Sequence, residues 1–175
     1  MASLAGSFLV ARPSLKDPNF ARTVVLILAH NADGAYGVVV NRPAQVTVSG
    51  LSFPVLAGGP CESPGLILLH GHPEWADAAP DEPGEDPTPQ GKAAPGIFIA
   101  DAHSWKQICD AAPGQPMRVR LVRGYAGWGP SQLEGELAAG AWAVVPADGK
   151  LLFDTPAEEL WSCLAPPKIP QPSVN

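Results

Sequence analysis

The chain lacks most of the features that mark secreted, membrane-spanning or disulfide-stabilised proteins. Only three of its 175 residues are cysteine, at positions 61, 109 and 163, and they form no CxxC pair. Such a pattern is typical of isolated thiols rather than of a disulfide framework. No apolar run approaches the ~20 residues that cross a bilayer, and the first residues lack the basic region of a secretory signal peptide. We therefore expect a cytoplasmic protein without a membrane span.

Basic charge is also scarce. The chain has 11 Lys and Arg residues against 17 Asp and Glu residues, a formal net charge of −6. The segment 71–95 holds six of these acids and one lysine, is rich in proline, and shows no periodicity, so we expect it to be an acidic surface loop. Without this segment, 11 acids face 10 bases, which leaves no positive excess to attract phosphates. Charge therefore does not favour nucleic-acid binding.

The composition itself is that of a globular protein, with 46% hydrophobic and 16% charged residues. We expect residues 1–165 to form a single domain and residues 166–175 to be a disordered tail. Apolar runs separated by Gly and Pro turns predict strands at 7–11, 23–30, 35–41, 66–70, 96–100, 117–123, 141–145 and 151–153. Short helices are predicted after Asp101, after Pro130 and after Thr155. The order favours an α+β fold with a mixed or antiparallel sheet of several strands and about three short helices.

Two stretches carry more local detail. The run Thr23–His30 is apolar and rich in β-branched residues, which predicts a strand buried on both faces. Asp33-Gly34 then predicts the turn of a hairpin. In the later helices, Ser131 and Glu134 stand at the spacing of a capping box, and Thr155-Pro156 reads as a cap followed by a first helical proline.

The most specific stretch is Gly124-Tyr-Ala-Gly-Trp-Gly-Pro130, which sets two large aromatic residues among three glycines. Glycine allows positive φ and close approach of the backbone to another group. The spacing is neither the Walker pattern nor GxGxxG, and aromatic residues occupy the places that phosphate loops keep small. We therefore interpret the stretch as a tight turn that Tyr125 and Trp128 pin to the core.

Many residues along the chain match one bacterial family in the same order. They are 6–11, 17–25, His30, 34–37, 41–43, 58–60, 69–70, 124–130, 132–134, Trp142 and 160–161. Over nearly its whole length the sequence resembles the YqgE/AlgH family. The resemblance implies an α+β fold and a label of transcriptional regulator that has no defined chemistry. The chain departs from the family pattern at Ala29, Cys61 and Ser131.

Three Gly-, Pro- and aromatic-rich loops supply the candidate binding site. If the fold brings them together, they line a concave patch with Arg42 as its polar anchor, which would bind a protein partner or a small ligand. The candidate residues are Asn41, Arg42, Pro43, Gly58, Gly59, Pro60, Gly124, Tyr125, Gly127 and Trp128. Direct DNA recognition is disfavoured, because the sequence has no helix-turn-helix pattern and no basic helix. Arg118 and Arg120 share one face of a strand, which is typical of a solvated surface.

The alternative is a small-molecule enzyme of hydrolase type. His30 and His70 each end a buried apolar strand, so both can emerge at one edge of the sheet. A metal held by this pair with Asp101 or Glu134 lacks any recognised ligand spacing. Cys61 reads as an ordinary loop thiol, since the sequence places no base beside it. The sequence therefore assigns no catalytic residue, metal or cofactor, and favours a binding protein over an enzyme.

Overall fold

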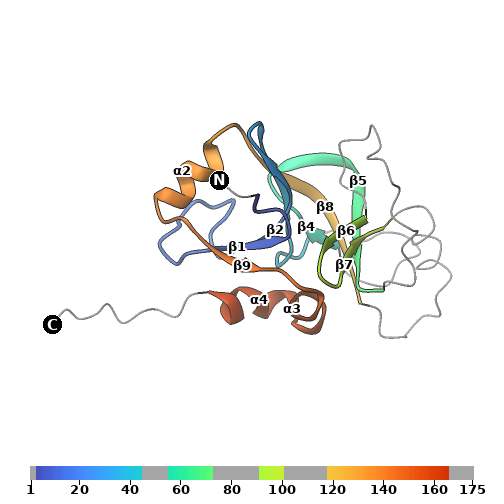
Figure 1. Ribbon diagram of the computed structural model, residues 1–175. Coiled ribbons are helices and arrows are strands. Elements are labelled where there is room, and N and C mark those ends of the chain that lie inside the picture. The colour runs from blue at the N-terminus through green and yellow to red at the C-terminus, as the bar shows by residue number, and fades with distance from the viewer. Residues whose placement is uncertain (1–2, 45–54, 73–90, 101–117, 166–175) are drawn as a thin grey trace.

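One strongly curled sheet dominates the computed structural model, which describes residues 3–44, 55–72, 91–100 and 118–165 (Figure 1). Its strands are β1 (Ser7–Ala11), β2 (Val24–Asn31), β3 (Gly34–Val39), β4 (Val55–Ala57), β5 (Cys61–His70), β6 (Gly91–Ala94), β7 (Ile97–Ile99), β8 (Val119–Trp128) and β9 (Trp142–Pro146). Their order is β6-β7-β5-β8-β3-β2-β1-β9, and every pair along this path is antiparallel. Strand β4 pairs with β8 in parallel.

The described helices are α2 (Gln132–Ala138), α3 (Gly149–Asp154) and α4 (Ala157–Leu164). A mostly antiparallel sheet with three helices in this part of the chain agrees with the α+β prediction. None of these helices is long and apolar enough to cross a membrane. The predicted helix after Asp101, the predicted tail and most of the acidic loop lie outside the described residues.

Two apolar layers enclose the central strands, because alternate residues of β1 and β2 point to opposite faces. One layer joins these strands to α3 and α4, and it includes Phe8, Val10, Val24, Leu26, Leu152 and Leu160. The other joins them to α2, and it includes Leu9, Val25, Ile27, Trp128, Leu133 and Trp142. Figure 1 shows α2 on one side of β1 and β2 and the α3–α4 pair on the other. The prediction that 23–30 is buried on both faces is therefore confirmed for Val24–Ile27.

Strand β8 connects the two halves of the curled sheet. Its first half pairs with β4 and β5, and its last residues, Ala126–Trp128, pair with β3. Gly124 lies between the two halves with φ 86°, a conformation that glycine adopts without strain. The predicted turn at 124–130 is therefore wrong over most of its length, since the strand continues to Trp128.

The glycines of this stretch serve close contact between backbones. A Cβ atom on Gly58 would overlap the carbonyl oxygen of Gly124, and one on Gly59 would overlap the carbonyl oxygen of Tyr125. The glycines therefore allow close approach of the protein's own backbone, where the residues that follow β4 pack against β8.

Two further local predictions are corrected. Residues 151–153, predicted as a strand, lie in α3, because the side chain of Asp148 accepts a hydrogen bond from the N–H of Leu151 at 2.8 Å and starts a helix there. Residues 91–94, placed in the acidic loop, form β6 against β7.

The expected caps are also absent from two of the described helices. Ser131 adopts φ 63° and makes no side-chain cap bond to α2. The N-cap of α4 is Pro156, one residue later than predicted, and it likewise makes no side-chain cap bond. Both helices form where the sequence predicts them, but burial of Leu133 and Leu160 stabilises them in place of the expected caps.

Candidate functional site

Asn41 and Arg42 hold the loop that precedes β2. The Asn41 Oδ1 atom accepts the N–H of Val24 at 2.8 Å, and its Nδ2 donates to the carbonyl of Arg22 at 2.9 Å. The Arg42 guanidinium donates to three backbone carbonyls of the same loop, those of Asn19 at 2.7 Å, Ala21 at 2.9 Å and Pro18 at 3.2 Å. Both side chains therefore act as structural ties, and the predicted polar anchor already has partners within the chain.

The structure brings only part of the predicted patch together. Arg42, Gly59 and Pro60 line a small hollow of about 100 Å³ with Asn19, Val39 and Ala57. Pro43 is exposed and bridges to Leu56, while Gly58 and Gly124 are buried. Gly127 is exposed on β8 beyond Tyr125, so it lies away from this hollow.

The two aromatic residues of the motif pack into different parts of the sheet. The ring of Tyr125 lies 5.0 Å from that of Tyr36. The pKa of Tyr36 is raised, mainly because the side chain is partly buried and to a smaller extent by the charge interaction with Tyr125. Trp128 is 5% exposed and packs on Phe20 and Trp142. We therefore find the predicted patch divided between a small hollow at Arg42 and a buried aromatic cluster at Trp128.

A carboxylate ties this aromatic cluster to α2. The Oε1 atom of Glu136 accepts the indole N–H of Trp142 at 3.0 Å and that of Trp128 at 3.2 Å. Its Oε2 atom accepts from the Gln132 side chain at 3.2 Å. Because buried indole N–H groups need partners, Glu136 stabilises both tryptophans in their positions.

The expectation that His30 and His70 emerge at one edge of the sheet is wrong. His70 pairs with Val119 at the start of β8, whereas His30 pairs with Ala35, which pairs with Trp128 at the end of β8. Between β2 and β5 lie three antiparallel pairings, β2 with β3, β3 with β8 and β8 with β5. Strands β2 and β5 therefore run in opposite directions. The histidines lie at opposite ends of a ten-residue strand, about 30 Å apart along its length.

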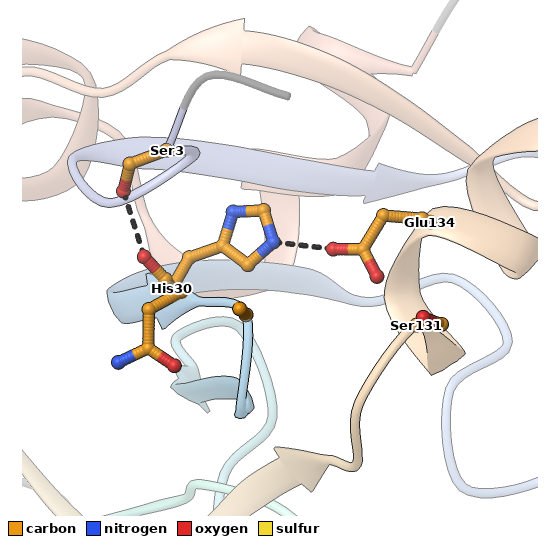
Figure 2. Close-up of a pocket in the computed structure, with 6 residues that line it drawn as sticks. Ser3, His30, Ser131 and Glu134 are labelled. Atoms are coloured by element: carbon orange, nitrogen blue, oxygen red, sulfur yellow. Dashed lines mark hydrogen bonds and ion pairs between the residues drawn. The ribbon is translucent and has the colours of Figure 1, made fainter.

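His30 instead joins three segments that are distant in sequence (Figure 2). Its ring Nε2 lies 2.5 Å from Oε1 of Glu134 in α2. Its Nδ1 accepts the backbone N–H of Leu4 at 3.0 Å, and its carbonyl accepts the hydroxyl of Ser3 at 3.2 Å. The imidazole is almost fully buried, with a side-chain exposure of 4%.

These contacts fix the tautomer of the imidazole. A nitrogen that accepts a backbone N–H carries no proton of its own, so Nδ1 is unprotonated and Nε2–H donates to Glu134. The hydrogen bond from His30 is the largest cause that lowers the pKa of Glu134 below its ordinary value of 4.5. The pair is therefore a neutral imidazole and an ionised carboxylate, with a net charge of −1.

A hollow of about 330 Å³ opens beside this pair. We call it the Glu134 hollow; its lining residues are Ser3, His30, Asn31, Ala32, Ser131 and Glu134. Figure 2 shows the second carboxylate oxygen of Glu134 turned away from the imidazole, toward the side on which Ser131 lies. Ser131 makes no capping bond to α2, and the lining combines hydroxyl, amide and carboxylate groups.

A second hollow, of about 210 Å³, is lined in part by the same hairpin. We call it the Trp128 hollow, and it shares Asn31 with the Glu134 hollow. Its other lining residues are Ala29, Asp33, Gly34, Ala35, Tyr36 and Trp128. The β2–β3 hairpin therefore forms a common wall of both.

The sequence suggested His30 for an enzyme or metal site and Glu134 as a metal ligand or capping residue. It did not indicate that Ser3, Asn31 and Ser131 join them in one site. His30 and Glu134 are 104 residues apart, and no local spacing relates them. The available signal was that both belong to the residues matched to the family. Within the described residues, no group of three or more His, Cys, Asp or Glu side chains could hold a metal ion; Asp101 lies outside them.

Two solved structures share this curled-sheet α+β fold. A crystal structure of a protein from Corynebacterium diphtheriae matches with a TM-score of 0.71 at 24% identity, over 91% of this chain and 84% of that one. The solution structure of the AlgH protein from Pseudomonas aeruginosa matches with a TM-score of 0.64 at 28% identity, over 93% of this chain and 87% of that one.

Sequence comparison places the chain within a family. The AlgH-like family model matches residues 8–166. A UPF0301 protein from Nitrosococcus oceani is 35% identical, covering 94% of this chain and 89% of that protein. A UPF0301 protein from Streptomyces avermitilis is 39% identical, covering 92% and 84%. The chain therefore belongs to the AlgH-like family, as the resemblance predicted.

Proposed function

We propose that this protein binds a small polar ligand in the Glu134 hollow and acts as a ligand-responsive regulator rather than as an enzyme. The observation that carries the proposal is the hollow itself, a concavity of about 330 Å³ whose polar groups come from three separate segments of the chain. Ligand pockets usually span roughly 300–1,000 Å³ and place a few polar groups around the ligand. A small metabolite fits the lower end of that range.

The state of His30 supports binding over catalysis. A general base needs a ring nitrogen that is free to take a proton from the substrate. Here Nδ1 accepts the N–H of Leu4, and Nε2 donates to Glu134, so both nitrogens are engaged within the protein. His70, the other histidine of the enzyme hypothesis, lies at the far end of β8.

The exposed surface supports a small ligand over a large protein partner. Stable protein interfaces usually centre on buried aromatic or aliphatic side chains. Among the residues that the structure describes, the large hydrophobic side chain that is exposed is Val144, at 43%. The aromatic residues of the predicted patch are instead packed against Phe20, Tyr36 and Trp142.

Two arginines at the start of β8 support the prediction against direct DNA recognition. The Arg120 guanidinium donates to the carbonyls of Leu152, Phe153 and Thr155, and so completes the end of α3. Burial lowers the pKa of Arg120, against the opposing effects of Glu158 and Asp154. Arg118 stacks on Phe153 and pairs with Asp154 at 3.7 Å. Both side chains are therefore turned to the protein's own helix rather than offered as a phosphate-binding row.

The proposal is tested by amide chemical-shift mapping with four chemically distinct probes at millimolar concentration: glucose, succinate, adenosine and 1,4-diaminobutane. We expect at least one probe to cause saturable shifts at residues 30–34 and 131–134, while the amides around Arg42 and Gly59 stay unchanged as an internal control. Shifts confined to the Arg42 hollow, or no saturable shift with any probe, would contradict the proposal.

A further inference from the structure

We infer that the ligand of the Glu134 hollow is a free aliphatic diamine, with one ammonium group at Glu134 and its chain extending along the β2–β3 hairpin into the Trp128 hollow. This inference rests on the proposed function and names the class of ligand for the same site. Three observations carry it: the charge of the His30–Glu134 pair, the charges of both linings, and the place of Asn31 in the lining of both hollows.

The first observation is that the carboxylate charge of Glu134 is not cancelled by His30. An ion pair would require the imidazole to be protonated on both nitrogens. The N–H of Leu4 points at Nδ1 from 3.0 Å, so a proton on Nδ1 would set two donors against each other. We infer that the imidazole is neutral, so that the carboxylate of Glu134 stands as the charged group of the lining beside its hydroxyl and amide groups.

The second observation is the charge of the two linings taken together. Neither lining includes a Lys or Arg residue, and each includes one acid, Glu134 in the first hollow and Asp33 in the second. An anionic ligand would meet a like charge on both linings. A primary ammonium group suits the first hollow, because its three N–H donors match the carboxylate of Glu134 and the hydroxyl of Ser131.

The third observation concerns the space between these two acids. Both hollows are lined by Asn31 and by neighbouring residues of the β2–β3 hairpin, so a short chain that lies along this hairpin would reach from one to the other. The lining of the second hollow includes the small apolar residues Ala29 and Ala35. Their methyl groups suit the methylene groups of an aliphatic chain. A linear chain with a second ammonium group near Asp33 uses all of these features.

The test is isothermal titration calorimetry with 1,4-diaminobutane, alongside n-butylamine, 1,4-butanediol and succinate as matched probes. We expect the diamine to bind more tightly than the monoamine, and the neutral diol and the dianion to show no binding at the same concentrations. Diamines with three to six methylene groups should show an optimum length. Nα-acetyl-lysine amide represents a lysine side chain of a protein, and tighter binding of this probe than of every diamine would overturn the assignment to a free diamine.

Three variants make the test specific. Glu134→Gln keeps an oxygen that can accept from His30 but removes the charge, and should weaken diamine binding at least roughly tenfold. Asp33→Asn preserves the hairpin, since Asn-Gly is a favoured turn pair, and should weaken the diamine roughly threefold while leaving butylamine unchanged. Glu159→Gln removes the same charge from α4, on the opposite side of the sheet, and should leave diamine binding unchanged.

The failures of the two proposals can be told apart. Saturable shifts at residues 30–34 and 131–134 with glucose, adenosine or succinate, but not with amines, would overturn the diamine and leave the small-ligand function standing. The absence of saturable chemical-shift changes with every probe would overturn both proposals. Diamine binding that sodium chloride at equal ionic strength abolishes, or that Glu134→Gln leaves intact, would show general attraction to an acidic surface and overturn the assigned site.

Discussion

The imidazole of His30 and the carboxylate of Glu134 meet at 2.5 Å although 104 residues separate them in the chain. Their hydrogen bond joins the end of β2 to the first turn of α2. The same imidazole accepts the N–H of Leu4, so the segment before β1, the hairpin and the helix are held around one ring. The bond therefore shapes the wall of the Glu134 hollow and keeps the carboxylate ionised.

Glu134 gives a pH dependence of stability whose sign is fixed. The His30 hydrogen bond, as its largest cause, lowers the pKa of Glu134 below 4.5 in the folded protein. Such a carboxyl contributes stability that is fully present above the pKa of the unfolded chain and is lost as pH falls through the folded pKa. In urea titrations, the stability advantage of the wild type over Glu134→Gln should be constant well above pH 4.5 and shrink below it. An advantage that grows on acidification would contradict this assignment.

Arg42 should prove to be a structural residue. Replacing it by glutamine removes the donors to the carbonyls of Pro18, Asn19 and Ala21. We expect Arg42→Gln to lower the free energy of unfolding by about 1–2 kcal/mol, and the exposed Arg123→Gln to change it by less than about 0.5 kcal/mol. Equal effects of the two substitutions in chemical denaturation would show that the Arg42 contacts contribute nothing.

The glycines that follow β4 and pack against β8 should not tolerate a side chain. Gly59→Ala places a Cβ on the carbonyl of Tyr125 at a φ of 152° and should destabilise the protein by more than about 3 kcal/mol. Gly135→Ala in α2 meets nothing within 4 Å, and should stabilise it by about 0.5–1 kcal/mol through helix propensity. Thermal denaturation measures whether Gly59→Ala lowers the stability and Gly135→Ala raises it. An unchanged stability of Gly59→Ala would contradict the close contact between Gly59 and the carbonyl of Tyr125.

Glu136 should control the order of the tryptophan cluster. Glu136→Leu leaves the indole N–H groups of Trp128 and Trp142 without their acceptor, which should lower stability by about 2–4 kcal/mol. Glu136→Gln keeps a side-chain oxygen and should lose less than half as much. Near-ultraviolet circular dichroism reports the packing of the two indoles, and an unchanged spectrum in Glu136→Leu would disprove this role.

Much of the fold could be predicted because its determinants are local. The apolar runs 7–11 and 23–30 are enough to predict buried strands, and the Asp33-Gly34 pair predicts the hairpin between β2 and β3. Local rules failed where tertiary contacts decide. Leu151–Phe153 has the apolar composition of a strand, but the Asp148 cap and the Arg120 bonds to the end of the segment favour a helix.

The site was harder to predict, because its parts are related only through the folded sheet. Loop composition suggested a patch at Arg42, yet the donors of that side chain are used by carbonyls that the sequence cannot place beside it. The positions of His30 and His70 depend on strand direction, which the sequence left open between mixed and antiparallel sheets. Ser3, Asn31 and Ser131 carry no recognisable pattern and meet Glu134 only in three dimensions.

The protonation of the His30 ring tests the central claim of a net negative, ligand-binding hollow most directly. A long-range ¹H–¹⁵N spectrum of the histidine side chains at neutral pH distinguishes protonated from unprotonated ring nitrogens, and His30→Gln assigns the signals. The account predicts that Nε2 of His30 carries a proton and Nδ1 does not. Two protonated nitrogens would make the pair with Glu134 an ion pair, remove the uncompensated charge of the hollow, and contradict the account.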